Sequence, residues 1–168
     1  MQYTVLIVDD EPDIRDMLTQ ALSREPYEVL CADSAEEALD IIAQEPVDVV
    51  LSDEKMPGMS GTEFLAIVRR QYPDTIRMIL TGHASLESAI HAINEGEIYR
   101  FFTKPCNMVD LMVTIRQALQ HKDLMAENQR LLNIVRQQSS SLEALEKQHP
   151  AITKVKRNQN GTVIIDDD

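Results

Sequence analysis

Long hydrophobic runs are missing from this sequence of 168 residues. The longest apolar runs, such as Tyr3 to Val8, fall far short of the roughly 18 residues that a membrane-spanning helix needs. The chain also opens without a signal-peptide pattern, so we expect a cytoplasmic protein with no membrane partner. Cysteine is scarce as well. Cys31 and Cys106 show neither metal-ligand nor redox-pair spacing, and we expect both to be reduced thiols without a functional role.

Basic residues are also few relative to acidic ones. The sequence holds 16 Lys and Arg against 28 Asp and Glu, a net charge of -12. Residues 1–120 carry 9 basic and 21 acidic side chains, whereas residues 121–168 carry 7 of each. Nucleic-acid affinity depends largely on neutralised phosphates, so an acidic body with a neutral tail argues against a nucleic-acid partner. The hydrophobic fraction of 43% is ordinary, and the length suits one globular domain plus an appendage.

What the sequence does contain is a regular alternation of strand-like and helix-like segments. The apolar run at 3–8 is typical of a strand buried on both faces, and Ser34 with Glu37 forms a predicted capping box at a helix start. The predicted strands are 3–8, 27–32, 47–52, 77–81 and 98–104. The first predicted helix follows the first strand. The next three span about 34–44, 62–72 and 86–95, and the last begins near Met108. Five strand-helix repeats predict an α/β fold with a parallel sheet covered on both faces.

Polar residues follow four of the predicted strands. Asp9 and Asp10 come after the first strand, Asp53 after the third, Thr81 after the fourth and Lys104 after the fifth. Because ligands gather at the carboxyl ends of parallel strands, all five residues are expected on one rim of the sheet. Three carboxylates would repel one another unless a cation neutralised them, and hard oxygen ligands suit Mg²⁺. Asp53 could then attack a phosphoryl group whose oxygens are stabilised by the metal, Lys104 and Thr81.

Each of these residues also has an ordinary explanation. Asp9 and Asp10 precede a helix start, where acidic residues satisfy free amides and favour the helix dipole. Asp53 alone is more often a turn or cap residue, Thr81 a strand-end hydroxyl in a turn, and Lys104 a solvated lysine. Taken together, the ordinary explanations require five independent coincidences at strand ends, so we favour a common site.

Four segments, "VLIVDDEPD", "LSDEKMPGMSG", "ILTGH" and "FFTKP", resemble the signature segments of the response-regulator receiver domain of two-component signalling, in order and in spacing. The resemblance covers residues 2 to about 120. It implies a flavodoxin-like (βα)5 fold, a doubly wound sheet with strand order 2-1-3-4-5. It also implies Mg²⁺ as cofactor, and a phosphohistidine on a sensor histidine kinase or phosphotransfer protein as the phosphoryl donor.

The same resemblance implies a role for each matching acidic residue. Asp53 takes the place of the phosphoacceptor. Asp10 stands where the family has a direct Mg²⁺ ligand, and Asp9 where it has a ligand that acts mainly through water. The backbone carbonyl of Lys55 completes the protein's share of the metal shell. These four positions make up the implied metal and acceptor site.

The remaining signature positions imply phosphoryl binding and a switch. Thr81 and Lys104 would hold phosphoryl oxygens, and the family often has a cis bond where Lys104-Pro105 stands, which is plausible only because proline follows. Phe101 occupies the position of the family's aromatic switch: as Thr81 moves toward the phosphoryl group, the ring could rotate inward and change the surface beside the fifth strand. An ordinary core phenylalanine is the alternative.

Two positions depart from the simplest form of the pattern. Lys55 lies two residues after Asp53, and His83 lies two residues after Thr81. Both flank the place where a hydrolytic water would approach, so we expect their side chains to set the lifetime of the phosphoryl group. Solvated turn residues are the alternative.

The sequence after residue 107 predicts one long helix that ends near His149-Pro150. Asn128 and Val135 fall at a-type heptad positions, and Leu131 falls at d. The seam comprises Leu124, Asn128, Leu131, Val135, Gln138, Leu142 and Leu145. Asn at a single a position favours a parallel pair in fixed register, which predicts a homodimer; a single amphipathic helix packed on its own domain is the alternative. Leu132 and Ile134 widen the apolar face beyond what a two-stranded coil needs.

The last segment reads as strand, turn, strand, with Asn160-Gly161 as a hairpin turn. An isolated hairpin is marginal, so this segment would pair with its copy, dock on a partner or be disordered. The predicted organisation is therefore a receiver domain at 1–120, a coiled coil at 121–149 and a hairpin or flexible tail at 150–168.

These features together predict a stand-alone response regulator that signals through protein contacts to an unknown effector, because the residues after 120 leave no room for a helix-turn-helix domain. No enzyme activity is expected beyond self-phosphorylation and self-dephosphorylation. The segment "NEGEIYRFFTKP" resembles receivers attached to HD-GYP phosphodiesterases, which hints at a cyclic-di-GMP context. Two alternative functions are a small phosphatase with an aspartyl nucleophile and a phosphorylation-independent dimeric adaptor. Against the phosphatase, "VDDEPD" has adjacent acidic residues, whereas such enzymes place the second aspartate two residues after the nucleophile.

Overall fold

The computed structural model describes residues 3–82 and 98–148 and divides into two units, Met1–Lys122 and Asp123–Asp168. The predicted helix at 86–95, His83 and the predicted hairpin lie outside the described residues. The elements are β1 (Tyr3–Val8), α1 (Pro12–Leu22), β2 (Tyr27–Ala32), α2 (Ala35–Gln44), β3 (Val49–Asp53), α3 (Gly61–Gln71), β4 (Ile76–Thr81), β5 (Arg100–Thr103) and α5 (Met108–Gln148).

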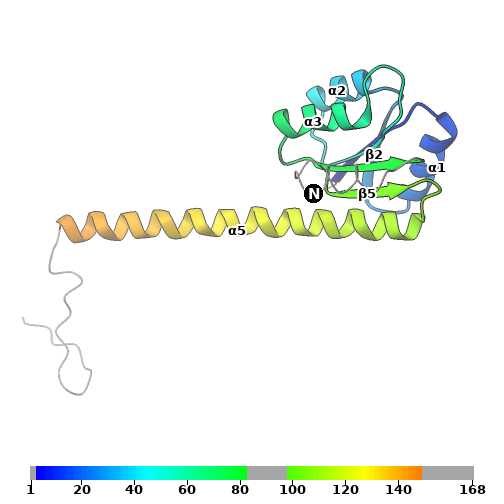
Figure 1. Ribbon diagram of the computed structural model, residues 1–168. Coiled ribbons are helices and arrows are strands. Elements are labelled where there is room, and N and C mark those ends of the chain that lie inside the picture. The colour runs from blue at the N-terminus through cyan, green and yellow to red at the C-terminus, as the bar shows by residue number, and fades with distance from the viewer. Residues whose placement is uncertain (1–2, 83–97, 149–168) are drawn as a thin grey trace, which may run out of the picture. The chain divides into compact units, whose positions relative to one another are not determined.

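The first unit is built on a parallel sheet of five strands in the order β2-β1-β3-β4-β5, which confirms the predicted topology. Successive residues of β1 point to opposite faces and enter different clusters: Leu6 and Val8 pack in one, Val5 and Ile7 in the other. The first cluster includes residues of α2 and α3, which Figure 1 shows together on one face of the sheet. The second includes residues of α1 and α5. Burial on both faces explains the continuous apolar run of β1.

The helix starts only partly match the prediction. Ser34 caps α2 and its side chain accepts a hydrogen bond from Glu37 N, but the Glu37 carboxylate accepts from Asp33 N at 2.8 Å rather than from the Ser34 backbone. The predicted capping box is therefore only half formed. A complete capping box occurs at Ser60 and Glu63, at the start of α3, where the sequence reading had not placed one.

The strand ends differ from the predicted ends by one or two residues. β3 spans Val49–Asp53, so Asp53 is the last residue of the strand and not the first residue after it. β5 is shorter than the predicted 98–104 because its register with β4 runs only from Arg100 to Thr103. One backbone bond continues past that end, from Lys104 N to Thr81 O at 2.8 Å. The ends of β4 and β5 are thus fixed to each other at the rim.

The second unit contains the far part of α5, which runs without a break to Gln148 and confirms the prediction of one long helix. Its large apolar side chains are exposed: Leu124, Met125, Leu131, Leu132, Ile134, Val135, Leu142 and Leu145. Within residues 3–82 and 98–148, no helix combines the length and the hydropathy that a bilayer crossing demands.

Candidate functional site

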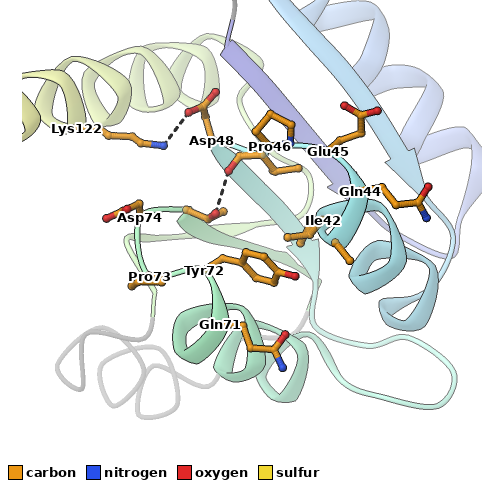
Figure 2. A pocket seen from close by; sticks show the side chains of 13 residues that line it. Ile42, Gln44, Glu45, Pro46, Asp48, Gln71, Tyr72, Pro73, Asp74 and Lys122 are labelled. Carbon is orange, nitrogen blue, oxygen red and sulfur yellow. Dashed lines mark hydrogen bonds and ion pairs between the residues drawn. The ribbon is translucent and has the colours of Figure 1, made fainter.

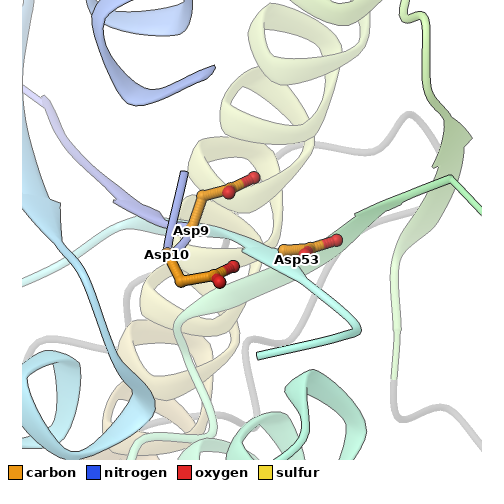
Figure 3. Close-up of side chains that lie close together, drawn as sticks. All are labelled: Asp9, Asp10 and Asp53. Carbon is orange, nitrogen blue, oxygen red and sulfur yellow. The ribbon is translucent and has the colours of Figure 1, made fainter. Parts of the chain in front are cut away.

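Three aspartates meet at the carboxyl end of the sheet, as the sequence predicts. Asp9 and Asp10 directly follow β1, and Asp53 ends the neighbouring strand β3. One carboxylate oxygen of each lies within 4.8 Å of the others, and Figure 3 shows the three side chains gathered at this edge. Asp9 and Asp53 are only 1% and 6% exposed, whereas Asp10 is exposed. The cluster is therefore open to solvent on the side of Asp10.

Among residues 3–82 and 98–148, one ammonium group, that of Lys104, contacts this cluster. Lys104 Nζ donates to Asp9 Oδ2 at 2.8 Å and lies 3.5 Å from Asp53 Oδ1. It also lies 3.4 Å from Glu11 Oε1, an acidic contact that the sequence reading missed. Asp9 Oδ1 accepts from Glu11 N at 2.9 Å, so both oxygens of Asp9 have partners. One cation is thus shared among several carboxylates.

The electrostatics follow from this imbalance. Burial raises the pKa of Asp53 above its ordinary value and the charge of Asp9 adds to the rise, while Lys104 and a backbone hydrogen bond from Glu54 oppose it. For Lys104, burial alone would lower the pKa, but the hydrogen bond and charge of Asp9 and the charge of Asp53 raise it overall. Lys104 is therefore a fixed positive charge, and the carboxylates still carry excess negative charge.

The donor set fits a hard divalent cation. Three carboxylates from two adjacent strand ends offer oxygens close enough to share one ion, and one of the three is exposed, which leaves room for water ligands. The excess negative charge at Asp53 is the environment that such a cation would relieve. Lys55, whose carbonyl is expected to contribute, follows two residues after Asp53 and has an exposed side chain. The residues present therefore suit Mg²⁺.

Of the other predicted residues, Thr81 lies at the same rim, and Phe101 lies two residues before the end of β5. The register pairs Asp53 with Leu80, which places Thr81 one residue beyond, and Thr81 is buried. Phe101 pairs with Ile79 and is half buried against the cluster on the α2 and α3 face. The Lys104-Pro105 bond is cis, as the resemblance implies.

Two residues near the site had not been singled out from the sequence. Arg15, in α1, donates from Nη1 to the Asp9 carbonyl at 2.6 Å and so holds the turn after β1. Glu54, directly after Asp53, turns away from the cluster and accepts hydrogen bonds from Thr62. The sequence could have indicated Arg15, because it lies in the first turns of the helix that follows Asp9 and Asp10. That position places its side chain near the end of β1.

One sizeable hollow of the first unit lies away from this cluster. It measures about 470 Å³ and is formed by the segments before β3 and before β4 (Figure 2). Its polar walls are already engaged: Lys122 Nζ donates to Asp48 Oδ1 at 2.7 Å, and Thr75 Oγ1 donates to Val47 O at 2.9 Å. Size alone therefore does not identify the functional site of this domain.

The tail residues predicted to form a dimer seam are on α5 of the second unit and are exposed. The exposed fraction is 64% for Leu124 and 50% for Leu131. A shallow groove on this helix is lined by Ile134, Gln137, Gln138, Ser141, Leu142 and Leu145. The helix thus has an unpartnered apolar stripe within its described residues, at the positions of the predicted seam.

Comparison with known proteins gives a consistent result. The family profile "Response regulator receiver domain" matches residues 5–116. Among curated proteins, a "Hydrogenase transcriptional regulatory protein HoxA" of Cupriavidus necator is 39% identical over 130 residues, 77% of this chain and 27% of that protein. "Response regulator protein PilR" of Pseudomonas aeruginosa is 34% identical over 154 residues, 92% of this chain and 34% of that protein. The chain thus spans only about a quarter to a third of the length of these relatives.

Solved structures agree with the sequence relatives. The signal receiver domain of an HD domain-containing protein from Pseudomonas fluorescens Pf-5 has a TM-score of 0.70 and 41% identity, covering 73% of this chain and 98% of that one. A CheY-like receiver domain protein from Methanospirillum hungatei has a TM-score of 0.70 and 35% identity, covering 74% of this chain and 99% of that one. With the fold, the three aspartates and the lysine at one rim, these matches show that the chain belongs to the response regulator receiver domain family.

Proposed function

We propose that Asp53 accepts a phosphoryl group from a histidine kinase or phosphotransfer protein in the presence of Mg²⁺. The observation that carries the proposal is the position of Asp53: it ends a buried strand, and its carboxylate lies beside those of Asp9 and Asp10 and 3.5 Å from Lys104. A buried carboxylate with excess negative neighbours and one ammonium is suited to a cation and to an incoming phosphoryl group. The predicted cytoplasmic location belongs to the same proposal.

The chemistry assigns a task to each residue. A carboxylate oxygen of Asp53 attacks the phosphorus, the bond from phosphorus to the donor imidazole nitrogen breaks, and its electron pair returns to the imidazole. Asp9, Asp10, Asp53 and the Lys55 carbonyl would hold Mg²⁺, which would neutralise charge on the phosphoryl oxygens. The Lys104 ammonium and the Thr81 hydroxyl donate to phosphoryl oxygens as the charge on them shifts. Asp9 keeps Lys104 in place through the 2.8 Å bond.

Labelling with a small acyl phosphate tests the proposal. The wild-type chain should gain the mass of one phosphoryl group when Mg²⁺ is present, and lose this gain when the metal is chelated. Asp53→Asn should abolish labelling, whereas Asp48→Asn, at the other end of β3, should not. Continuous turnover of an artificial phosphatase substrate, without stoichiometric labelling, would instead support the rival phosphatase function.

The lifetime of the phosphoryl group is proposed to depend on Lys55 and His83. Lys55 is exposed close after Asp53, so its long side chain can reach over the acceptor carboxylate and limit the approach of water. The test is the dephosphorylation rate of Lys55→Ala and His83→Ala. Rates unchanged from the wild type in both variants would refute this part of the proposal.

The signal is proposed to leave the site through Phe101. The half-buried ring packs against the same apolar cluster as Ile79, its register partner on β4, and so has room to become more buried. Because Phe101 has no hydroxyl, switching would depend on packing alone. Phe101→Ala should leave labelling of Asp53 intact while abolishing the phosphorylation-dependent change in binding to an effector.

The far part of α5 is proposed to form a parallel homodimer. The groove residues Gln138, Ser141, Leu142 and Leu145 are spaced i, i+3, i+4 and i+7, the spacing of a hole that receives one knob of a facing helix. Asn128 at an a position sets the register, since a copy in parallel register places its own Asn128 opposite. The charges of this segment are mixed, so two copies do not repel strongly.

Cross-linking tests orientation as well as association. In a chain carrying Cys31→Ser and Cys106→Ser, a single Gln138→Cys should form a disulfide with its own copy, because d positions face each other in a parallel pair. Ser140→Cys, on the outward side, is the matched control and should not. Sedimentation of a strict monomer, with or without the acyl phosphate, would contradict the dimer.

The output of the whole protein stays a prediction. We propose the stand-alone mode, the domain division and the cyclic-di-GMP context as predictions about the whole protein. The chain covers only 27% and 34% of two curated relatives, so the similarity to them does not extend to the output. The sequence resemblance to receivers of HD-GYP proteins is consistent with the neighbour from Pseudomonas fluorescens, which is described as part of an HD domain-containing protein. Pull-down with phosphorylated and Asp53→Asn chains would identify the effector.

A further inference from the structure

The loop that follows the phosphoacceptor is tied at both of its ends. Glu54, its first residue, accepts at Oε2 from Thr62 N at 3.0 Å and from Thr62 Oγ1 at 2.8 Å. The carbonyl of Glu54 accepts from Gly61 N at 3.0 Å. Glu54 therefore holds the start of α3 through its side chain and its backbone together, and we call this set of three bonds the Glu54 clamp.

The clamp also reaches the phosphoacceptor. The Glu54 backbone N–H hydrogen-bonds to the Asp53 carboxylate, and Ser52 Oγ donates to the Asp53 carbonyl at 2.8 Å. A side chain on Gly61 would overlap the Asp53 carbonyl oxygen, so α3 begins in direct contact with the end of β3. Any displacement of Glu54 would move the donor that orients Asp53.

The Glu54 carboxylate is hydrogen-bonded outside the metal site, to Thr62. It accepts from the Thr62 amide in the first turn of α3, where a helix N-terminus favours negative charge. Glu63 has the same relation to this turn, through the reciprocal bonds with Ser60. The helix start therefore holds two glutamates, but only Glu54 is covalently next to Asp53 and Lys55.

We propose that Glu54 is a positioning residue for the metal and phosphoryl site, acting by fixing the peptide plane that leads into Lys55. This inference rests on the proposed function, because the Lys55 carbonyl is an expected Mg²⁺ ligand only if the acceptor site is a receiver site. Residues that hold metal ligands in place are worth a large part of the metal affinity even though they do not touch the ion. Glu54 and Thr62 would then tune the affinity from behind the loop.

The test measures Mg²⁺ affinity by calorimetric titration of the full chain with the metal alone, alongside the thermal midpoint without metal. Glu54→Ala should weaken Mg²⁺ binding by about 10-fold, the lower end of the range for residues that support metal ligands. Thr62→Val should weaken it in the same direction, because it removes the hydroxyl bond while the charge of Glu54 stays. Glu63→Ala is the matched control: it should lower the thermal midpoint as the loss of a helix cap does, and leave the Mg²⁺ affinity unchanged.

The outcomes separate the explanations. Equal Mg²⁺ affinity in the wild type and in both clamp variants would reduce the clamp to a structural cap and overturn the proposal. A weaker affinity in Glu54→Ala alone would show that the charge of Glu54 acts through space, which also overturns it. Failure of the wild type to bind Mg²⁺ would refute the proposed function, and the clamp's role with it. Thr62→Val, the milder change, keeps the test decisive if Glu54→Ala does not fold.

Discussion

The strand β3 has an aspartate at each end, and the two carboxylates have opposite surroundings. Directly before the strand, Asp48 Oδ2 accepts from Thr4 N at 3.0 Å and Oδ1 accepts from Lys122 Nζ at 2.7 Å. At the last position, Asp53 lies 3.5 Å from Lys104, whose shorter bond of 2.8 Å goes to Asp9. One end pairs one carboxylate with one ammonium; the other end shares one ammonium among several carboxylates.

This difference separates a structural ion pair from a site. Asp48 has a partner at each oxygen, and its backbone also bonds to Thr4 O and to Ile76 N, so it joins β1, β3 and β4. At Asp53, burial and the charge of Asp9 raise the pKa, which means that the folded protein does not fully stabilise the charged form. A charge that the protein leaves unbalanced is available to a cation or a phosphoryl group, whereas a balanced charge is not.

The largest expected effect concerns the close contact at the Asp53 end. Gly61→Ala places a methyl group against the Asp53 carbonyl and 2.9 Å from the Asp53 carbonyl carbon, so backbone must shift. We expect the free energy of unfolding to fall by about 3 kcal/mol, as for severe overpacking. Denaturant titration measures the loss, and Gly82→Ala is the control, since no atom lies within 4 Å of its added Cβ. A loss below that of the control would contradict the tight contact between β3 and α3.

The next effect belongs to the Asp48 end. Asp48→Ala removes the acceptor of Thr4 N and leaves the Lys122 ammonium without its partner. We expect the free energy of unfolding to fall by about 2 kcal/mol, because a part-buried amide loses its hydrogen bond. Labelling of the purified chain at Asp53 should stay stoichiometric. A stable variant that loses labelling would break the comparison, because it would make the two ends of β3 one functional unit.

Sequence reasoning found the Asp53 end and missed the Asp48 end for a physical reason. Strand-terminal Asp, Thr and Lys residues are unusual enough at Asp53, Thr81 and Lys104 to reveal a shared rim once the parallel order is assumed. Asp48 and Lys122 are 74 residues apart and resemble ordinary surface charges, so only the folded chain brings them together. The direction in which a side chain points likewise depends on the folded chain and cannot be read from residue spacing.

The helix starts show this limit directly. Ser34-Glu37 and Ser60-Glu63 have the same capping-box spacing, but only the second pair closes reciprocally. In the first pair the glutamate carboxylate instead accepts a bond from Asp33 N. Which amide it chooses depends on the path of the preceding loop, and the spacing does not encode that path.

Removing the charge at Asp53 should have the opposite sign to the change at Asp48. Asp53→Asn removes a buried charge whose pKa is raised, so we expect the free energy of unfolding to rise at neutral pH. A carboxyl with a raised folded-state pKa destabilises the fold above that pKa, and the penalty disappears once pH falls below the unfolded value. The gain of Asp53→Asn over the wild type should therefore shrink from about pH 7 to about pH 4.

Denaturant titration at both pH values checks this sign. Since Asp48 has a partner at each oxygen, Asp48→Asn should not stabilise the chain at either pH. A loss of stability in Asp53→Asn at neutral pH would show that the Lys104 contact outweighs burial and the charge of Asp9. The carboxylates at both ends of β3 would then stabilise the fold, and only the size of that stabilisation would differ.

The smallest effect tests which partner of Asp48 matters. Lys122 is 27% exposed, so in Lys122→Met water can replace the ammonium at Asp48 Oδ1, while Thr4 N keeps its bond to Oδ2. We expect a loss of only about 0.5 kcal/mol in the free energy of unfolding, the scale of a solvent-accessible ion pair. Arg116→Met, which removes the more exposed pair with Glu25, is the matched control and should lose no more than that. A loss in Lys122→Met as large as in Asp48→Ala would mean that the carboxylate acts mainly through the lysine. The start of β3 would then depend on a single cation, as its end depends on Lys104.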